Sequence, residues 1–395
     1  MHKFAILFSM LFAVIAYYLN NEIIFEIAKL FSDIFISLLK LISLPLVFLS
    51  IVSTISGLKD SIEIKVLLKK ILFYTLLTTI IAAFVALSFY LLMDPVRKNF
   101  ISSTIESVSD SNHDYFSYLK SLIPSNFVQV FLENNVIGSI LIAFLMGGAI
   151  ISLSKEKQDI LHQIFSALFD TLLRIAQGLL KFIPLAVWSF ITCFLYELKG
   201  GSEFHSLFWY FACIMSANFV QAFVILPLLM WYKGISPIQT MKGVMPALTL
   251  AFFSKSSSSA TLPTTIECVQ NKLKVPNKLS SFILPICTTV NMNACAAFIL
   301  ITVMFVAEMN GHTFSLSEMF IWIFLATGAA IGNAGVPMGC YFMATSYLVS
   351  MNVPLYIMGL ILPIYTIIDM FETAINVWSD ICITQIINKE FKTQE

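Results

Sequence analysis

The chain has 395 residues, of which 58% are apolar and 12% charged, and its mean hydropathy is +0.87. Its 23 basic and 23 acidic residues cancel, so no basic surface argues for nucleic acid as a partner. Several apolar runs have roughly the 17 to 25 residues that a helix needs to cross the hydrocarbon core of a membrane. We therefore expect an all-α polytopic membrane protein. The serines have no His/Asp partners at a spacing that indicates a hydrolase, so we do not expect an enzyme.

The first half of the chain is expected to hold six membrane helices, at about residues 4–20, 23–58, 65–93, 133–153, 160–197 and 204–232. The second and the fifth are too long for an upright span, which implies a tilt or an interfacial portion. The serine-rich segment 94–132 has no core-forming pattern and is expected to be an exposed loop. The seven cysteines show no paired metal-ligand spacing, so we expect buried thiols rather than disulfides or a metal site.

The distribution of lysine and arginine predicts the topology. If the N-terminus is cytoplasmic and the spans alternate, basic residues concentrate in the cytoplasmic segments. Those left outside are Arg97, Lys98, Lys120 and Lys199. A bias of this size favours cytoplasmic N- and C-termini. This topology requires that both ends of segment 236–270 lie on one side of the membrane, and likewise both ends of segment 314–352. Each segment is therefore a pair of spans or a re-entrant hairpin.

Both of these segments are interrupted by small residues and proline. Residues 256–263 are SSSSATLP and residues 332–337 are GNAGVP, and the two stretches share the same order of polar, small, aliphatic and proline residues. Helices broken at membrane depth must be buried in protein or line a cavity. Corresponding breaks in two halves of a chain point to a transporter binding site at a repeat interface, so we favour two re-entrant hairpins.

Polar and acidic residues recur near the end of the chain in a segment that is otherwise apolar. At about 100° per residue, one stripe of a helix holds Asp369, Glu372, Thr373, Asn376 and Asp380. Ionisable groups at membrane depth are costly and usually face a bundle interior or a cavity. The stripe is therefore expected to bind a small charged solute and a cation.

Several motifs together resemble the dicarboxylate/amino acid:cation symporter family, which includes an archaeal aspartate transporter and mammalian excitatory and neutral amino acid transporters. The resemblance covers nearly the whole chain and is that of a divergent bacterial-type member. Its motifs are LPLVF at 44–48, PSN at 124–126, SSSSATLP at 256–263, NMN at 291–293 in place of NMDGT, AGVP at 334–337, and residues 369–380.

The resemblance implies eight transmembrane helices and two oppositely oriented re-entrant hairpins, arranged as inverted repeats in a homotrimer that works as an elevator. The implied divisions are scaffold helices at 1–60 and 133–200, a transport domain at 61–94 and 201–388, an extracellular loop at 95–132 and a cytoplasmic tail at 389–395. The second hairpin would act as a gate. The protein would lie in the cell membrane as a multi-pass protein.

The resemblance also implies the residues that contact substrate. Asp369 would pair with the α-ammonium of an amino acid, because a buried charge needs a counter-charge. Thr373 and Asn376 lie one and two turns further on and would contact the amine and the α-carboxylate, which Ser258 and the backbone of the hairpin tips would also hold. The full substrate set is Ser257, Ser258, Cys295, Gly335, Val336, Asp369, Glu372, Thr373 and Asn376.

Sodium ions are expected as the coupling ions. The resemblance assigns a first sodium site to Asn291, Asn376 and Asp380, and a second to backbone near residues 330–333, with Met292 close by. The third site would involve Thr78, Thr79 and Asn293. The family has an aspartate where this chain has Asn293 and a tyrosine where it has Thr75, so we expect fewer coupled sodium ions or weaker coupling.

Glu372 departs most informatively from the family, whose members that carry acidic substrates have an arginine there. A glutamate would repel an acidic side chain, and Cys295 replaces a threonine that such substrates also use. Four roles for Glu372 are open: pairing with a cationic or amine-bearing cargo, accepting hydrogen bonds from a neutral one, carrying a coupling proton, or pairing internally with Lys255. The expected function is sodium-coupled amino acid symport, with proton-coupled or glutamate-type transport and an anion channel as alternatives.

Overall fold

The computed structural model describes residues 2–19, 21–57, 62–96, 126–132, 136–197, 202–257, 261–333 and 338–392. This described part is helical throughout and contains no strand. Its elements are α1 (His2–Leu19), α2 (Glu22–Ser56), α3 (Ile62–Met93), α5 (Gln129–Leu132), α6 (Val136–Ile151), α7 (Lys155–Leu180), α8 (Ile183–Glu197), α9 (Ser202–Val220), η2 (Gln221–Ile225), α10 (Leu226–Tyr232), α11 (Pro237–Ser254), α12 (Leu262–Asn271), α13 (Asn277–Val290), α14 (Asn293–Met309), α15 (Leu316–Gly332), α16 (Gly339–Ser350) and α17 (Tyr356–Lys392).

The expected all-helical class is confirmed, and one expected helix is wrong. Residues 160–197 form two helices, α7 and α8, which are separated at Lys181 and Phe182. Pro184 stands in the first turn of α8, where its missing N–H costs nothing, whereas inside a helix it would remove a hydrogen bond. Residues 204–232 do continue as one rod, although the π-helical turn η2 joins α9 to α10.

The two interrupted segments break where their small residues and prolines predict. The helices α11 and α12 are separated by residues 255–261, and α15 and α16 by residues 333–338. Lys255 ends α11 in a left-handed backbone conformation, with a φ of 54°. A third interruption, at residues 291–292, separates α13 from α14 and was not expected.

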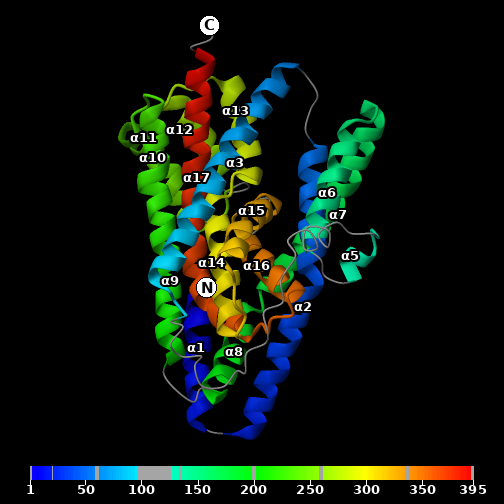
Figure 1. Cartoon of the computed structure of the whole chain (residues 1–395), viewed down its shortest axis with the longest axis vertical. Coiled ribbons are helices and arrows are strands. Elements are labelled where there is room, and N and C mark those ends of the chain that lie inside the picture. The colour runs from blue at the N-terminus through cyan, green and yellow to red at the C-terminus, as the bar shows by residue number, and fades with distance from the viewer. Residues whose placement is uncertain are drawn as a thin grey trace.

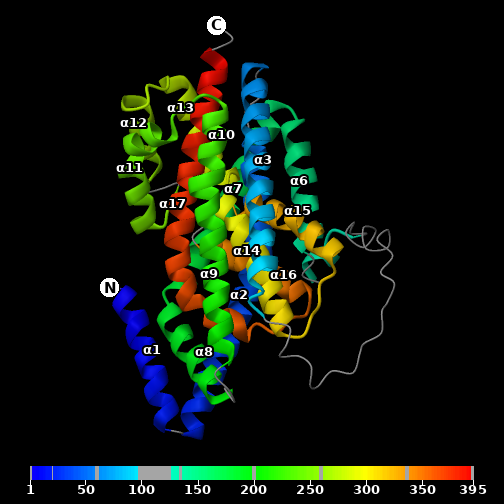
Figure 2. The same cartoon turned by 60° about the vertical axis from the view of Figure 1, so that its left-hand side comes forward.

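The helix α14 forms the centre of the fold (Figures 1 and 2). Every residue from Asn293 to Glu308 is buried. It packs against α3, α9, α15, α16 and α17. A helix that is apolar on all sides is stable only when protein or lipid surrounds it, and here its neighbours do so.

A second group of helices borders this centre, with α2, α6 and α7 to its right and α1 and α8 below it in Figure 1. The long helix α2 packs against α6, α7 and α8, and α1 packs against α8. Two close contacts join this group to the rest: the Ser50 hydroxyl donates to the carbonyl of Gly332, and a Cβ on Gly359 would lie 2.2 Å from the Phe190 ring. Gly359 therefore allows α17 to approach α8.

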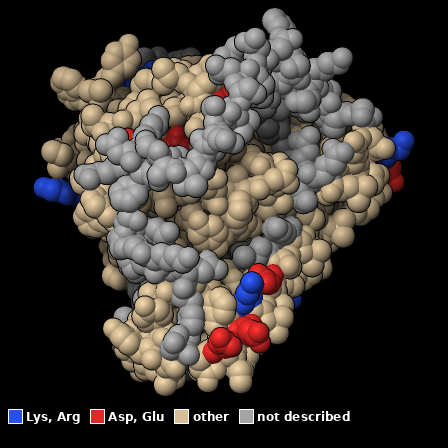
Figure 3. All heavy atoms as spheres, turned by 60° about the horizontal axis from the view of Figure 1, so that its bottom comes forward, with Lys and Arg blue, Asp and Glu red and all other residues tan. Residues whose placement is uncertain are grey.

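The outer surface carries many large apolar side chains, including Trp231, Phe324 and Phe208, each more than 60% exposed. On the face drawn in Figure 3, uncharged residues predominate, and the visible charged side chains form one cluster in the lower part and scattered groups elsewhere. Within the described ranges, four segments are long and apolar enough to cross a membrane: Val66–Met93, His205–Tyr232, Asn277–Met309 and Tyr356–Phe391. Such a surface fits a lipid environment.

The helix α17 continues to Lys392, and its last turns pack against other helices. Glu390 forms ion pairs with Lys70 of α3 at 2.8 Å and with Lys233 after α10 at 2.7 Å, and the Tyr74 hydroxyl donates to the same carboxylate. The hydrogen bond that the Lys233 ammonium donates to Glu390 is the main cause that raises the pKa of Lys233. This charged cluster ties the end of α17 to two other helices.

Candidate functional site

The interruption between α13 and α14 lies against the polar stripe of α17. Asn291 and Met292 have non-helical ψ angles of 81° and 61°, so the first backbone N–H groups of α14 need partners outside their own helix. Asn376 of α17 supplies one, because its side-chain oxygen accepts from the N–H of Ala294 at 3.0 Å. Thr288, Thr289 and Asn291 are weak helix formers, which is the sequence signal that could have predicted the break.

The carboxylate of Asp380, one of the three in the α17 stripe, contacts Asn291 at this break. The Asn291 side-chain amide donates to Asp380 at 2.8 Å and to the Ser379 hydroxyl at 2.9 Å. The second carboxylate oxygen of Asp380 has no hydrogen-bond partner, although the residue is only 1% exposed. A buried oxygen in that position is suited to a hard cation, so the residues present fit the expected sodium ion.

Asn293 and the two threonines expected at a third sodium site lie together in a closed polar network. The Asn293 carbonyl oxygen accepts from the hydroxyls of Thr78 at 3.2 Å and Thr79 at 2.7 Å, and its amide donates to Ser379 at 2.6 Å. All of these side chains are buried. The amide is neutral and its oxygen already accepts two hydrogen bonds, so it lacks the charge that a carboxylate would bring to a cation.

A small polar cavity, of about 20 Å³, lies on the other side of the break. Its lining comes from the residues that follow α11, the α13–α14 break, α14, the residue that follows α15, α16 and α17. The lining residues are Lys255, Ser257, Met292, Cys295, Asn333, Cys340, Tyr365, Asp369, Glu372, Thr373 and Asn376. This volume holds about one water molecule.

The lining brings together seven of the residues predicted from the sequence: Ser257, Met292, Cys295, Asp369, Glu372, Thr373 and Asn376. Ser258, Gly335 and Val336 were also predicted but lie outside the described residues. The members of the α17 stripe are all at most 8% exposed, as expected for a stripe that faces the bundle interior. Asp380 lies apart from the cavity, in the Asn291 network.

Lys255 pairs with a different carboxylate from the one considered as its partner. Its ammonium nitrogen lies 3.9 Å from a carboxylate oxygen of Asp369, and not against Glu372 as one of the four interpretations had it. The reason is tertiary: the left-handed end of α11 directs the lysine to the α17 turn that carries Asp369. Lys255 is about a third exposed, so this contact is a weak ion pair.

The buried carboxylate of Glu372 has few hydrogen-bond partners. One of its carboxylate oxygens has no hydrogen-bond partner, and the other has a long 3.5 Å contact with the Tyr365 hydroxyl. The side chain is 1% exposed. If all three charged groups of the cavity are ionised, Lys255, Asp369 and Glu372 leave it with one net negative charge.

The side chains of three residues that line the cavity were not predicted from the sequence: Tyr365, Asn333 and Cys340. Tyr365 lies one and two turns before Asp369 and Glu372 on α17, so helical periodicity could have found it. Asn333 and Cys340 flank the α15–α16 break, and the Asn333 amide lies 3.2 Å from the Cys295 sulfur and 3.4 Å from the Cys340 sulfur. Nothing in the local sequence predicts that contact, because Cys295 is on a different helix.

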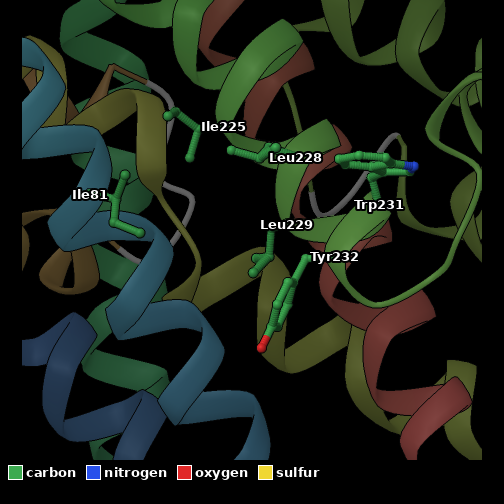
Figure 4. Close-up of a pocket in the computed structure, with 6 residues that line it drawn as sticks. All are labelled: Ile81, Ile225, Leu228, Leu229, Trp231 and Tyr232. Atoms are coloured by element: carbon green, nitrogen blue, oxygen red, sulfur yellow. The ribbon is translucent and has the colours of Figure 1, made fainter.

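A far larger cavity, of about 600 Å³, lies elsewhere (Figure 4). It is formed by Ile81 of α3 and by residues of η2 and α10, namely Ile225, Leu228, Leu229, Trp231 and Tyr232. The lining is almost wholly apolar, and Trp231 and Tyr232 are more than 70% exposed. It resembles a lipid-facing groove and holds no charged group for a polar cargo.

Comparison with known proteins gives a consistent result over nearly the whole chain. A model of the sodium:dicarboxylate symporter family matches residues 3–390. Excitatory amino acid transporter 3 of Mus musculus is 26% identical over 415 residues, which cover 92% of this chain and 79% of that protein. Neutral amino acid transporter B(0) of Bos taurus is 25% identical over 383 residues, which cover 88% of this chain and 70% of that protein.

The Asn291 network predicts a large loss of stability for Asn291→Ala. The variant removes the donor that serves both Asp380 and Ser379 and leaves a buried carboxylate without its hydrogen bond, which costs about 2 kcal/mol or more. Thermal unfolding of the detergent-purified protein in sodium-free buffer measures the effect. Asn310→Ala is the matched control, because its amide bonds only to Val306 at the half-buried end of α14. Equal losses in the two variants would contradict the prediction.

Proposed function

This chain belongs to the sodium:dicarboxylate symporter family, and from that premise we propose that it is a sodium-coupled symporter that carries an amino acid across the cell membrane. The observation that supports this most is the meeting of the α17 stripe with the α13–α14 break. There one face of α17 carries a carboxylate suited to an ammonium group, Asp369, in the cavity, and further along an orphaned carboxylate oxygen suited to sodium, on Asp380, in the Asn291 network. Asn376 lies between them in the sequence and contacts the break.

The roles of the side chains follow from their chemistry. The α-ammonium of the cargo takes the place of Lys255 as the partner of Asp369, and Thr373 and Asn376 complete its contacts. The α-carboxylate is held by the first hairpin at Ser257 and Ser258. Asn291, Asn376 and Asp380 hold the first sodium ion, and backbone near residues 330–333 holds the second.

The charge of the cavity supports a neutral or amine-bearing cargo over an acidic one. A zwitterionic amino acid adds no net charge, and a cationic side chain cancels the negative charge that Glu372 carries when it is ionised. An acidic side chain would add a second uncompensated charge in a buried site, which is strongly unfavourable. One relative is named for excitatory amino acids and another for neutral amino acids, so the family alone does not choose between these cargoes.

The small size of the cavity supports a gate. A volume of about 20 Å³ cannot hold an amino acid, so cargo enters only when an element of the lining moves. The α15–α16 pair is the proposed gate, because Asn333 and Cys340 on either side of its tip close the cavity. Its tip includes Gly335 and Val336.

The larger architecture of the proposal comes from the family resemblance. We propose eight transmembrane helices with α11–α12 and α15–α16 as re-entrant hairpins. The chain would form a homotrimer through the α1, α2, α6, α7 and α8 group, with both termini in the cytoplasm. The remaining helices would move together as the transport domain, in an elevator motion against that scaffold.

Uptake into liposomes tests the proposed function. Purified protein with an inward sodium gradient should concentrate a labelled neutral or amine-bearing amino acid above its outside concentration, and should lose this ability when potassium replaces sodium. Screening all amino acids identifies the cargo. Equilibration without concentration would indicate a channel, and preferred uptake of aspartate or glutamate would contradict the proposed cargo class.

Glu372→Arg should shift the preference of the carrier toward acidic amino acids, because a guanidinium in that position pairs with a side-chain carboxylate. We expect the ratio of aspartate uptake to uptake of the wild-type cargo to rise about tenfold or more, which corresponds to about 1.4 kcal/mol. Glu372→Gln is the matched control, since it removes the charge without reversing it, and it should not gain aspartate uptake. An unchanged ratio in Glu372→Arg would show that this position does not face the cargo.

Asn293→Asp should add a carboxylate to the threonine network and strengthen the dependence on sodium. In sodium-free buffer the variant should melt at a lower temperature than the wild type, because it buries an uncompensated charge. Added sodium should raise that melting temperature more than it does for the wild type. Asn310→Asp makes the same chemical change outside the network and should show no such gain. If both variants respond to sodium like the wild type, this network is not a lost cation site.

A further inference from the structure

Two buried thiols and a carboxylate converge at the cavity from three different helices. The sulfurs of Cys295 on α14 and Cys340 on α16 and a carboxylate oxygen of Glu372 on α17 all lie within 4.8 Å of one another. The three residues are 3%, 2% and 1% exposed, so the group is enclosed by protein. Across the described ranges, no other three His, Cys, Asp or Glu residues meet in this way.

A second observation indicates that this group lacks a ligand. One carboxylate oxygen of Glu372 has no hydrogen-bond partner, and such an orphaned buried oxygen is costly. The nearest hydroxyl, that of Tyr365, makes only the long contact to the other oxygen. The Asn333 amide is turned toward both sulfurs, so it does not serve the carboxylate.

We propose that Cys295, Cys340 and Glu372 form a binding site for a soft divalent cation of the zinc and cadmium type. Thiolate, imidazole and carboxylate groups are the ligands of zinc, and a three-residue set leaves a fourth position open. Zinc binds sulfur at about 2.3 Å and oxygen at about 2.0 to 2.2 Å. The three ligand atoms, which lie within 4.8 Å of one another, must therefore draw closer around an ion. When the ion binds, the two thiols release their protons to solvent and coordinate as thiolates.

The surroundings favour a soft ion over sodium at this position. The thioether sulfur of Met292 lies 4.0 Å from the Cys295 sulfur, so a third sulfur borders the site. Sodium is a hard cation and prefers oxygen, which it finds in the Asn291 and Asp380 group instead. The chain therefore offers separate oxygen and sulfur sites, whose α17 members Asp380 and Glu372 lie about two turns apart.

Metal binding has a mechanical consequence that rests on the proposed function. An ion at this site would join α16, one arm of the proposed gate, to α14 and α17. It would also occupy Glu372, which is proposed to face the side chain of the cargo. Cadmium or zinc should therefore inhibit uptake, and cargo should protect against the inhibition.

Cadmium binding to the full-length protein in detergent tests the site without any need for transport. The protein is kept reduced with a phosphine, and cadmium is titrated while the ultraviolet thiolate-to-cadmium charge-transfer absorbance is recorded. We expect one tight equivalent. Cys295→Ala and Cys340→Ala should each weaken it by about 100-fold, by analogy with losses at other metal sites. Glu372→Gln should weaken it without abolishing the absorbance, because both sulfurs remain.

Cys213→Ala is the matched control, since Cys213 is a buried thiol on α9 away from the cavity, and the variant should bind cadmium as the wild type does. Absence of the charge-transfer absorbance in the wild type overturns the proposal. Its persistence in the Cys295→Ala/Cys340→Ala double variant does so as well, because the metal is then bound elsewhere. If one single variant fails to fold, the other decides the same question.

Uptake assays separate this proposal from the proposed function. If cadmium binds as expected but the liposomes concentrate no amino acid, the metal site stands and the transport function fails. The opposite outcome is sodium-driven uptake by a wild-type protein that does not bind cadmium and that cadmium does not inhibit. In that case the transport function stands and the metal site fails.

Discussion

Three carboxylates buried on one face of α17 are the constraint on which the rest of the centre depends. Asp369, Glu372 and Asp380 are each at most 8% exposed within a helix that is otherwise apolar, and buried charge is tolerated only with compensation. The chain meets this need by interrupting the facing helix. The break at residues 291–292 frees backbone groups that a continuous helix would use internally, and it places the Asn291 amide against Asp380.

The three carboxylates are compensated to different degrees, and this divides the site by chemistry. Asp380 accepts from an amide and keeps one free oxygen, which suits a hard cation. Asp369 has the ammonium of Lys255 at 3.9 Å, a weak partner that an α-ammonium can replace. Glu372 has only a long hydroxyl contact and two neighbouring sulfurs. The position with the least compensation is therefore the one that would distinguish cargoes and attract a soft metal.

The same arrangement links binding to motion. The cavity is closed by residues from both interrupted helix pairs, and its present volume excludes an amino acid. In the proposed transport cycle one of these pairs would move, whereas the α14 core is buried on all sides. The hydroxyl contact from Ser50 to Gly332 and the close approach of α17 to α8 at Gly359 mark the surfaces where the two helix groups meet. Small residues at those surfaces allow close packing without interlocking side chains.

The sequence alone determined the helical class, the approximate bounds of five of the six helices expected up to residue 232, and the composition of the α17 stripe. These are local properties: apolar runs predict the helices, small residues and proline predict the breaks at 255–261 and 333–338, and a period of about 3.6 residues places Asp369 through Asp380 on one face. Only the tertiary structure decided which partners those residues have. The pairing of Lys255 with Asp369 rather than Glu372, and the meeting of Cys295 with Cys340 and Asn333, join helices that are distant in sequence, so no spacing along the chain encodes them. The break at 291–292 lies between these cases, because its residues form helices weakly, but it is the contact of Asn376 with Ala294 that stabilises the interruption.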